Sequence, residues 1–202
     1  MQITVIIPTL DVQKGRQTAR MAHDLAGMPS GSLKTAIAVD SNAKGFVCTV
    51  NRGLEEVNCG DVCLLNDDAR PDQNWLAALA GEMEKRAGMQ AWFAGPSGPC
   101  RTPPQSGGRI GDRRRPRFVR HLSGFCLLVA REAIETLGGL DERFTHYAGE
   151  VDWQWRAAQE CGARSLWVPG VYVDHEAHLP TRPDWWKEDH RLLREIWEVQ
   201  ND

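Results

Sequence analysis

The chain has 202 residues, of which 42% are hydrophobic and 25% charged, and its net charge is −3. These values are typical of a soluble globular protein of one domain, and they exclude intrinsic disorder and fibrous repeats. The chain enters an apolar run at once, and its longest apolar run, 125–130, is far too short to cross a bilayer, so we expect a soluble cytoplasmic protein with no signal sequence and no transmembrane segment.

Strands and helices are predicted to alternate through the first half of the chain. The β-branched run 3–7 ends at Pro8, as expected of a buried strand that stops abruptly. The elements expected next are a helix at 16–27, a strand at 34–39, a helix at 47–57, a strand at 61–65, a helix at 73–86 and a strand at 90–94. This alternation predicts an α/β fold with a mostly parallel sheet and helices on both faces.

A long loop rich in proline and glycine is predicted at 95–116. Loops of this length inside compact domains are lids, binding loops or disordered segments. The elements expected after it are a strand at 118–130, helices at 131–137 and 150–161, strands at 165–168 and 171–173, and a helix at 184–199. Seven arginines and one aspartate lie between residues 101 and 121, which gives this segment a charge of +6 and favours a polyanionic partner if it is ordered.

The sequence Asn66-Asp67-Asp68 follows the expected strand 61–65 directly. In an open α/β sheet, ligands bind at the carboxyl ends of the strands, so these side chains are expected at the edge of a crevice. Carboxylate oxygens at such an edge suit Mg²⁺ or Mn²⁺, and a divalent ion suits a diphosphate ligand. The alternative is an Asx-rich turn that caps the next helix.

A series of motifs in order along the chain resembles family 2 glycosyltransferases with the GT-A fold. The motifs are Lys44-Gly45, Asn66 to Pro71, Ser123-Gly124, Leu137 to Phe144, Tyr147 to Trp153, and Val168 to His175. The resemblance covers residues 2 to about 178 and implies a single GT-A (Rossmann-like) domain over 1–202, a three-layer α/β/α sandwich. Its parts would be a nucleotide-sugar-binding half at 1–95, the arginine-, proline- and glycine-rich loop at 96–121, and an acceptor-side half with a C-terminal helix at 122–202.

The resemblance also implies a donor site for a UDP-, GDP- or dTDP-linked sugar. The residues it assigns to the nucleotide, the ribose and the surrounding framework are Pro8, Thr9, Asp11, Asp40, Asn42, Lys44, Asn51, Asn66 and Asp67. Asp68 would be the metal ligand of the family's DXD position, in which Asn66 replaces the first acid. His175 would complete a site for Mn²⁺ or Mg²⁺, with His178 as the second choice, and an imidazole ligand favours Mn²⁺ mildly.

The family's catalytic acid is expected at Glu150. The sequence reads Gly149-Glu150-Val151-Asp152, so the first acid of the family's usual pair is missing. Near the start of a helix, Glu150 would be kept ionised by the helix dipole and would act as the base of an inverting, hexosyltransferase-like reaction. Asp152 would have either a structural or a catalytic role, and a helix cap is the alternative role for Glu150.

The acceptor and the arginine-rich segment leave several interpretations open. The arginines would bind the phosphates of an acceptor, including a nucleic acid with hydroxylated bases. Alternatively, they would close over the donor diphosphate, or they would belong to a solvated loop. A nucleotidyltransferase is disfavoured because no glycine-rich phosphate loop follows the first strand. A catalytically inactive module that binds sugar nucleotides or nucleic acid is the alternative outside the enzymes. The sequence does not indicate the oligomeric state.

Overall fold

The computed structural model describes residues 1–109, 111–175 and 182–198. Its helices and strands are β1 (Ile3–Thr9), α1 (Val12–Leu25), β2 (Leu33–Val39), α2 (Phe46–Glu55), β3 (Asp61–Leu65), β4 (Arg70–Pro71), α3 (Trp75–Glu84), β5 (Ala91–Ser97), β6 (Arg117–Val119), β7 (Cys126–Val129), α4 (Arg131–Leu137), α5 (Gly149–Cys161), β8 (Arg164–Asp174) and α6 (Pro183–Trp197). Two short 3₁₀ turns lie at Ala87–Met89 and Gln105–Gly107. Across the described ranges, no helix combines the length and the apolar composition that crossing a bilayer requires.

The strands form one mixed sheet in the order β2-β1-β3-β7-β5-β8-β4, and β6 also pairs with β8. Five strands (β1, β2, β3, β5 and β8) run in the same direction, whereas β4, β6 and β7 run against them. The expected mostly parallel sheet is therefore confirmed. The carboxyl ends of β1, β3, β5 and β8 consequently meet at the same edge of the sheet.

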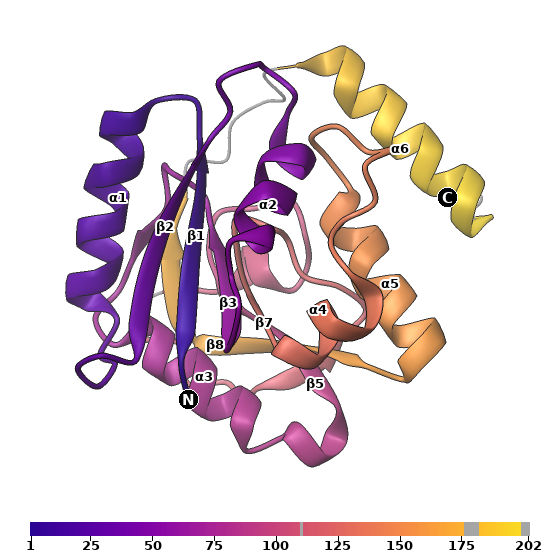
Figure 1. Cartoon of the computed structure of the whole chain (residues 1–202). Coiled ribbons are helices and arrows are strands. Elements are labelled where there is room, and N and C mark those ends of the chain that lie inside the picture. Colours follow the sequence, from indigo (N-terminus) through magenta and orange to yellow (C-terminus); the bar gives the residue numbers. More distant parts are fainter. Residues whose placement is uncertain (110, 176–181, 199–202) are drawn as a thin grey trace.

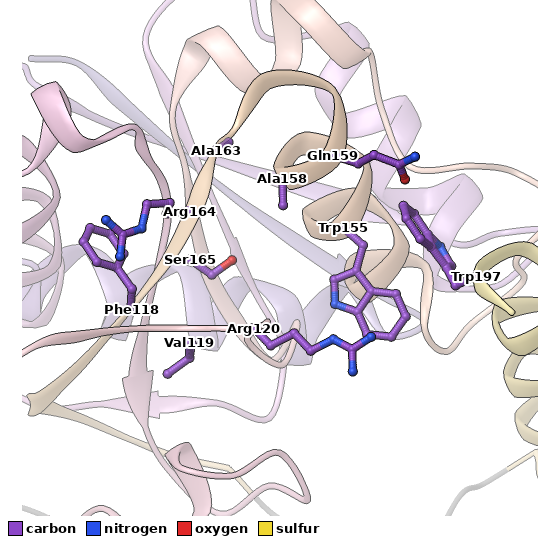
Figure 2. Close-up of a pocket in the computed structure, with 10 residues that line it drawn as sticks. All are labelled: Phe118, Val119, Arg120, Trp155, Ala158, Gln159, Ala163, Arg164, Ser165 and Trp197. Atoms are coloured by element: carbon purple, nitrogen blue, oxygen red, sulfur yellow. The ribbon is translucent and has the colours of Figure 1, made fainter. Parts of the chain in front are cut away.

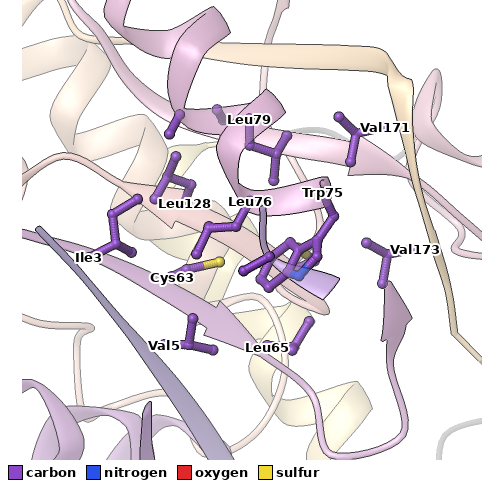
Figure 3. Packing of buried hydrophobic residues seen from close by; sticks show 14 of the residues in the cluster. Ile3, Val5, Cys63, Leu65, Trp75, Leu76, Leu79, Leu128, Val171 and Val173 are labelled. Carbon is purple, nitrogen blue, oxygen red and sulfur yellow. The ribbon is translucent and has the colours of Figure 1, made fainter. Parts of the chain in front are cut away.

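Helices cover both faces of the sheet (Figure 1). Side chains that alternate along the strands belong to two hydrophobic cores, one on each face. Residues of α1 and α3 pack on one face, where Trp75 and Leu76 of α3 meet Val5 and Cys63 of the strands (Figure 3). Residues of α2, α4 and α5 pack on the other face, and α6 lies against it with partly buried side chains. This arrangement is the expected three-layer α/β/α sandwich.

The helices on the first face leave β3 between them. Helix α1 contacts β1 and β2, whereas α3 contacts β5 and β8. In open α/β sheets, ligands bind in a crevice at the carboxyl ends of the strands. The loops that follow β1 and β3 lie at this point.

The strand expected at 118–130 is two strands, β6 and β7, and that expectation was wrong. Between them the backbone bonds to side chains: Leu122 donates to Gln154 Oε1 at 2.8 Å and accepts from Gln154 Nε2 at 2.8 Å. The Ser123 amide likewise donates to Gln105 Oε1 at 2.8 Å. Since these groups are satisfied without a strand partner, the chain can turn toward β7.

The strands expected at 165–168 and 171–173 are one long strand, β8, whose edge partner changes along its length. Its first residues pair with β6 and its last residues pair with β4. Helix α1 begins at Val12 rather than at residue 16 because Asp11 caps it: Asp11 Oδ1 accepts from the amides of Gln13 at 2.8 Å and Lys14 at 3.3 Å. The expected end of the last helix, at residue 199, lies outside the described residues.

Part of the segment expected as a long loop is packed into the protein. Strand β5 continues to Ser97, whose hydroxyl accepts a hydrogen bond from Trp167 Nε1 at 3.1 Å. Gln105 is fully buried, and its Nε2 donates to the Pro96 carbonyl at 2.9 Å. These bonds order the start of the segment against β5 and β8.

Candidate active site

The turn after β3 delivers three polar side chains to the edge of the sheet. The Asn66 amide donates to the Phe125 carbonyl at 2.9 Å, and the Ala69 amide donates to the Asn66 carbonyl at 3.1 Å. These backbone bonds fix the turn against the chain that enters β7. Asp67 and Asp68 therefore leave the sheet at a defined place.

Asp67 faces the end of β1 and the first turn of α1. Thr9 Oγ1 donates to Asp67 Oδ2 at 2.5 Å, and Lys14 Nζ lies 3.0 Å from Asp67 Oδ1. Thr18 Oγ1 donates to the Asp67 carbonyl at 2.6 Å. The carboxylate thus joins the ends of β1 and β3, where the crevice opens.

Asp68 faces the opposite side, toward the end of β8. His175 Nε2 lies 3.4 Å from Asp68 Oδ1 and 3.2 Å from Asn66 Nδ2. The other ring nitrogen, Nδ1, lies 3.2 Å from the carbonyl of Pro99, and the ring stacks on Phe125 with centroids 5.0 Å apart. A carbonyl at Nδ1 selects the tautomer with its proton there, which leaves the Nε2 lone pair directed at Asp68 and Asn66.

Glu150 lies in the first turn of α5, beside the chain that leads into β7. The Gly124 amide donates to Glu150 Oε1 at 3.3 Å. A Cβ on Gly124 would lie 3.1 Å from Glu150 Cγ, so the close approach of the two residues favours glycine there. Burial raises the pKa of Glu150, the Gly124 amide opposes that rise, and the charge of Asp189 adds to it.

Two opposing effects act on the carboxyl group of Glu150: its place in the first turn of α5 favours the ionised form, and burial disfavours it. The side chain of Glu150 is partly buried. The loss of water around its carboxyl group raises its pKa more than the backbone amides of Glu150 and Gly124 lower it. Its proton affinity is therefore above that of an ordinary glutamate.

Two consecutive residues connect Glu150 with the pair formed by Asp68 and His175. Gly124 contacts Glu150, and Phe125 carries the ring that stacks on His175. The surroundings of Glu150 and of His175 are therefore linked through one short stretch of backbone.

The other residues expected at the donor end are engaged in local turns. Both carboxylate oxygens of Asp40 accept from backbone amides, of Lys44 at 2.9 Å and of Gly45 at 2.8 Å. Asp11 caps α1, Pro8 belongs to β1, and Asn42 is exposed. The carboxyl ends of β1 and β2 therefore bring Asp11 and Asp40 near Thr9.

Two expected site residues lie elsewhere. Asn51 Oδ1 accepts from the Leu140 amide at 2.9 Å, and its Nδ2 donates to the Leu140 carbonyl at 2.9 Å, which ties α2 to the loop before α5. Asp152 is 1% exposed and bonds to Arg156 at 2.8 Å and Trp197 Nε1 at 3.0 Å. Because residues two apart on a helix do not face the same side, Asp152 points away from Glu150.

Sequence reasoning missed Lys14, Phe125 and Asp189. Asp189 of α6 is 2% exposed and accepts from the amides of residues 145, 146 and 147 at 3.0, 2.9 and 2.8 Å, so it anchors the loop that leads to Glu150. No local motif marks these residues, because each of them acts through a partner that is distant in sequence.

The donor set at this edge fits a divalent cation. One carboxylate and one imidazole, with the far ring nitrogen held by a carbonyl, are a recurring pattern around metal ions. Two protein ligands leave room for a diphosphate and water, as Mg²⁺ sites commonly do. Within the part of the chain that the structure describes, no group of three or more His, Cys, Asp and Glu side chains could hold a metal ion. His178, the second choice, lies outside the described residues.

Known structures share this fold. GalNAc-T7, solved with UDP, GalNAc and Mn²⁺, superposes with a TM-score of 0.67 at 15% identity and covers 96% of this chain and 48% of that chain. S. aureus TarS 1–349 gives a TM-score of 0.64 at 14% identity, over 100% of this chain and 67% of that chain. A197 from STIV gives 0.56 at 11% identity, over 88% and 87%. The fold is therefore that of the GT-A glycosyltransferases.

Sequence comparison finds a partial relative that is itself a glycosyltransferase. No family model matches the chain. Over 75 residues it is 42% identical to N-acetylglucosaminyl-diphospho-decaprenol L-rhamnosyltransferase of Mycobacterium tuberculosis, in the strains CDC 1551 and H37Rv. The match covers 37% of this chain and 24% of the relative, so the chain matches about a quarter of that protein's length.

Proposed function

We propose that the protein is a metal-dependent, inverting glycosyltransferase of the family 2 type, which moves a sugar from a nucleoside-diphosphate sugar to an acceptor hydroxyl. The observation that supports this proposal is that Gly124, whose amide bonds to Glu150, is followed in the chain by Phe125, whose ring stacks on His175 beside Asp68. A base and a cation site adjacent in one crevice are what direct displacement of a diphosphate needs.

Asp68 and His175 would hold the cation, Mn²⁺ or Mg²⁺. When bound, the ion supplies positive charge that stabilises the leaving nucleoside diphosphate. Pro99 and Phe125 orient the imidazole, one by its carbonyl at Nδ1 and the other by ring stacking. Asn66 lies beside His175 Nε2, where its amide would contact a ligand of the same ion or the diphosphate itself.

Glu150 would act as the base. Its raised pKa makes its carboxylate a stronger proton acceptor than that of an exposed glutamate. It takes the proton of the acceptor hydroxyl while the oxygen forms a bond to the anomeric carbon and the bond from that carbon to the diphosphate oxygen breaks. Attack from the face opposite the leaving group inverts the anomeric configuration, and no covalent enzyme intermediate is required.

The donor's nucleoside would lie at the ends of β1 and β3. Thr9, Asp67 and Lys14 form a connected group there, with hydroxyl, carboxylate and ammonium groups within hydrogen-bond distance of one another. Such groups suit the hydroxyls of a ribose and the charge of a diphosphate. The presence of UDP in the GalNAc-T7 structure supports a UDP sugar as the first donor to test, ahead of GDP and dTDP sugars.

A thermal-shift screen of UDP, GDP and dTDP sugars, each with and without Mn²⁺, tests the proposal. A donor at about 100 times its Kd should add about 2.7 kcal/mol and raise the Tm by roughly 5 to 10 °C. The shift should require Mn²⁺ and disappear in Asp68→Ala, whereas Asp24→Ala, at an exposed position of α1, should retain it. A metal-independent shift, or one that survives in Asp68→Ala, would contradict the assigned cation site.

A further inference from the structure

Three exposed arginines lie on and beside the edge strand β6: Arg117, Arg120 and Arg164, called here the arginine edge. Among the residues that the structure describes, β6 pairs only with β8, so its other side is an open edge. None of the three guanidinium groups has a carboxylate partner within the described ranges. They therefore present uncompensated positive charge.

The register brings two of these charges to neighbouring places. Val119 of β6 pairs with Ser165 of β8, so Arg120 and Arg164 follow at the next position of the antiparallel ladder. Their guanidinium groups then diverge, that of Arg120 toward the ring of Trp155 and that of Arg164 toward the ring of Phe118.

Aromatic rings hold the arginine side chains. The Arg120 Cζ lies 4.2 Å from the ring centroid of Trp155, and the Arg164 Cζ lies 3.4 Å from that of Phe118. The Arg117 Cζ lies 5.1 Å from that of Trp167. Cation–π contacts of this kind orient a guanidinium but leave its N–H groups available to an acceptor.

A cavity of about 590 Å³ lies between β6, β8, α5 and α6 (Figure 2). Its lining includes Arg120 and Arg164 as well as the aromatic side chains Phe118, Trp155 and Trp197, and none of the described residues that line it is acidic. Figure 2 shows Arg120 reaching toward Trp155 on one side and Arg164 lying over Phe118 on the other. The cavity is thus cationic and aromatic at the same time.

The wall of the cavity also holds a buried donor without an acceptor. Trp155 is 9% exposed, and its Nε1 has no hydrogen-bond partner among the described residues. The ring of His121, which packs edge-on against Trp155 with centroids 5.7 Å apart, likewise has a buried Nδ1 with no partner there. Buried polar groups normally find partners, so these two unpaired atoms mark the wall beside Trp155 as incompletely satisfied by the described residues.

We infer that the arginine edge and this cavity bind a single-stranded nucleic acid, with phosphates on the guanidinium groups and one base in the cavity. The cations are spread along a strand, with about 10 Å of backbone between Arg117 and Arg120, rather than converging on one point as they would around a single diphosphate. A phosphate chain whose flat bases meet aromatic and guanidinium faces fits this pattern. A membrane surface fits less well, because the exposed large hydrophobic residues, Met1, Leu10, Val12 and Met89, do not line the cavity.

The location connects this surface with the proposed active site. Helix α5 carries Glu150 in its first turn and Trp155 five residues later, about 7.5 Å along the helix axis. From Arg120 the chain continues through Leu122, which is bonded to Gln154, to the Gly124 amide at Glu150. A nucleic acid held at the edge would therefore be an acceptor, and this role, unlike the binding itself, rests on the proposed function.

Fluorescence anisotropy with a labelled 15-nucleotide single-stranded DNA, at several KCl concentrations, tests the binding. In Arg120→Gln/Arg164→Gln the loss of two phosphate contacts should raise the Kd roughly 25-fold at 0.1 M salt and reduce the salt slope by about 1.4. Arg16→Gln/Arg20→Gln removes the same charge from exposed positions of α1 and should bind like the wild type. If the first variant is unfolded by circular dichroism, Arg117→Gln should still raise the Kd roughly fivefold.

Three results would overturn the inference: no wild-type binding below roughly 100 µM DNA, equal losses in the edge variant and the α1 control, or binding to anionic phospholipid vesicles but not to DNA. The donor screen is a separate measurement. DNA binding without any donor shift would support the nucleic-acid surface and contradict the acceptor role. A donor shift without DNA binding would support the proposed function and overturn both the nucleic-acid surface and the acceptor role.

Discussion

The two charged regions of the molecule hold their charges in different ways. In the crevice, each acidic group is engaged by this chain: Asp67 by Thr9 and Lys14, Asp68 by His175, and Glu150 by the Gly124 amide. At the arginine edge, the guanidinium groups contact aromatic faces and have no carboxylate partner among the described residues.

In the two proposals above, the charges of the crevice serve chemistry and those of the arginine edge serve binding. The crevice groups are fixed at defined distances, as transfer of a proton requires. The arginines are oriented but not neutralised, as recognition of an extended anion requires. The predictions below test the crevice side of this comparison, from the largest expected effect to the smallest.

Glu150→Gln should lower kcat for sugar transfer by about 10²- to 10⁴-fold, because a glutamine cannot accept the proton of the acceptor hydroxyl. Donor binding, followed by the Mn²⁺-dependent thermal shift, should survive. Glu160→Gln, at an exposed position of the same helix, is the matched control and should keep the wild-type rate. A wild-type rate in Glu150→Gln would show that another residue is the base, and the crevice would then differ from the arginine edge in its contacts but not in its role.

Asp152→Asn should lower the free energy of unfolding by about 2 to 3 kcal/mol, measured by urea denaturation. The carboxylate is buried and paired with Arg156, and the estimate is reduced because Arg156 is 23% exposed. Asp24→Asn on α1 should change the stability by less than about 0.5 kcal/mol. A large loss of kcat in Asp152→Asn with unchanged stability would show that Asp152 acts in catalysis rather than in folding.

The pH dependence of stability should reveal the buried state of Glu150. Because its pKa is raised in the folded protein, the wild type loses stability relative to Glu150→Gln as the pH rises from the ordinary glutamate pKa through the raised value. Below that window the two proteins should melt alike, and above it the variant should have the higher Tm. A wild type that instead gains stability with pH would mean that the helix terminus, rather than burial, sets this pKa.

The alternation of elements was predictable because it depends on local patterns. The sequence shows directly the apolar strands, the glycines and prolines that end them, and the turn Asn66-Asp67-Asp68 after β3. The structure confirms the α/β/α layers that these features imply. The prediction failed at 118–130, where side chains of Gln105 and Gln154 take the backbone bonds that a strand would have made. No local pattern encodes a competitor so distant in the chain.

The sequence by itself determined the fold class, the place of the acidic turn at a strand end and the local excess of arginine, since these follow from side-chain periodicity and composition. Only the tertiary structure decided which groups meet. The pairing of β8 beside β5 brings His175 to Asp68, and the packing of α5 buries Glu150 against Gly124. The same packing places Arg120 over the ring of Trp155. Distances between remote residues and the loss of water around them are properties of the packed chain, and they set the chemistry of both regions.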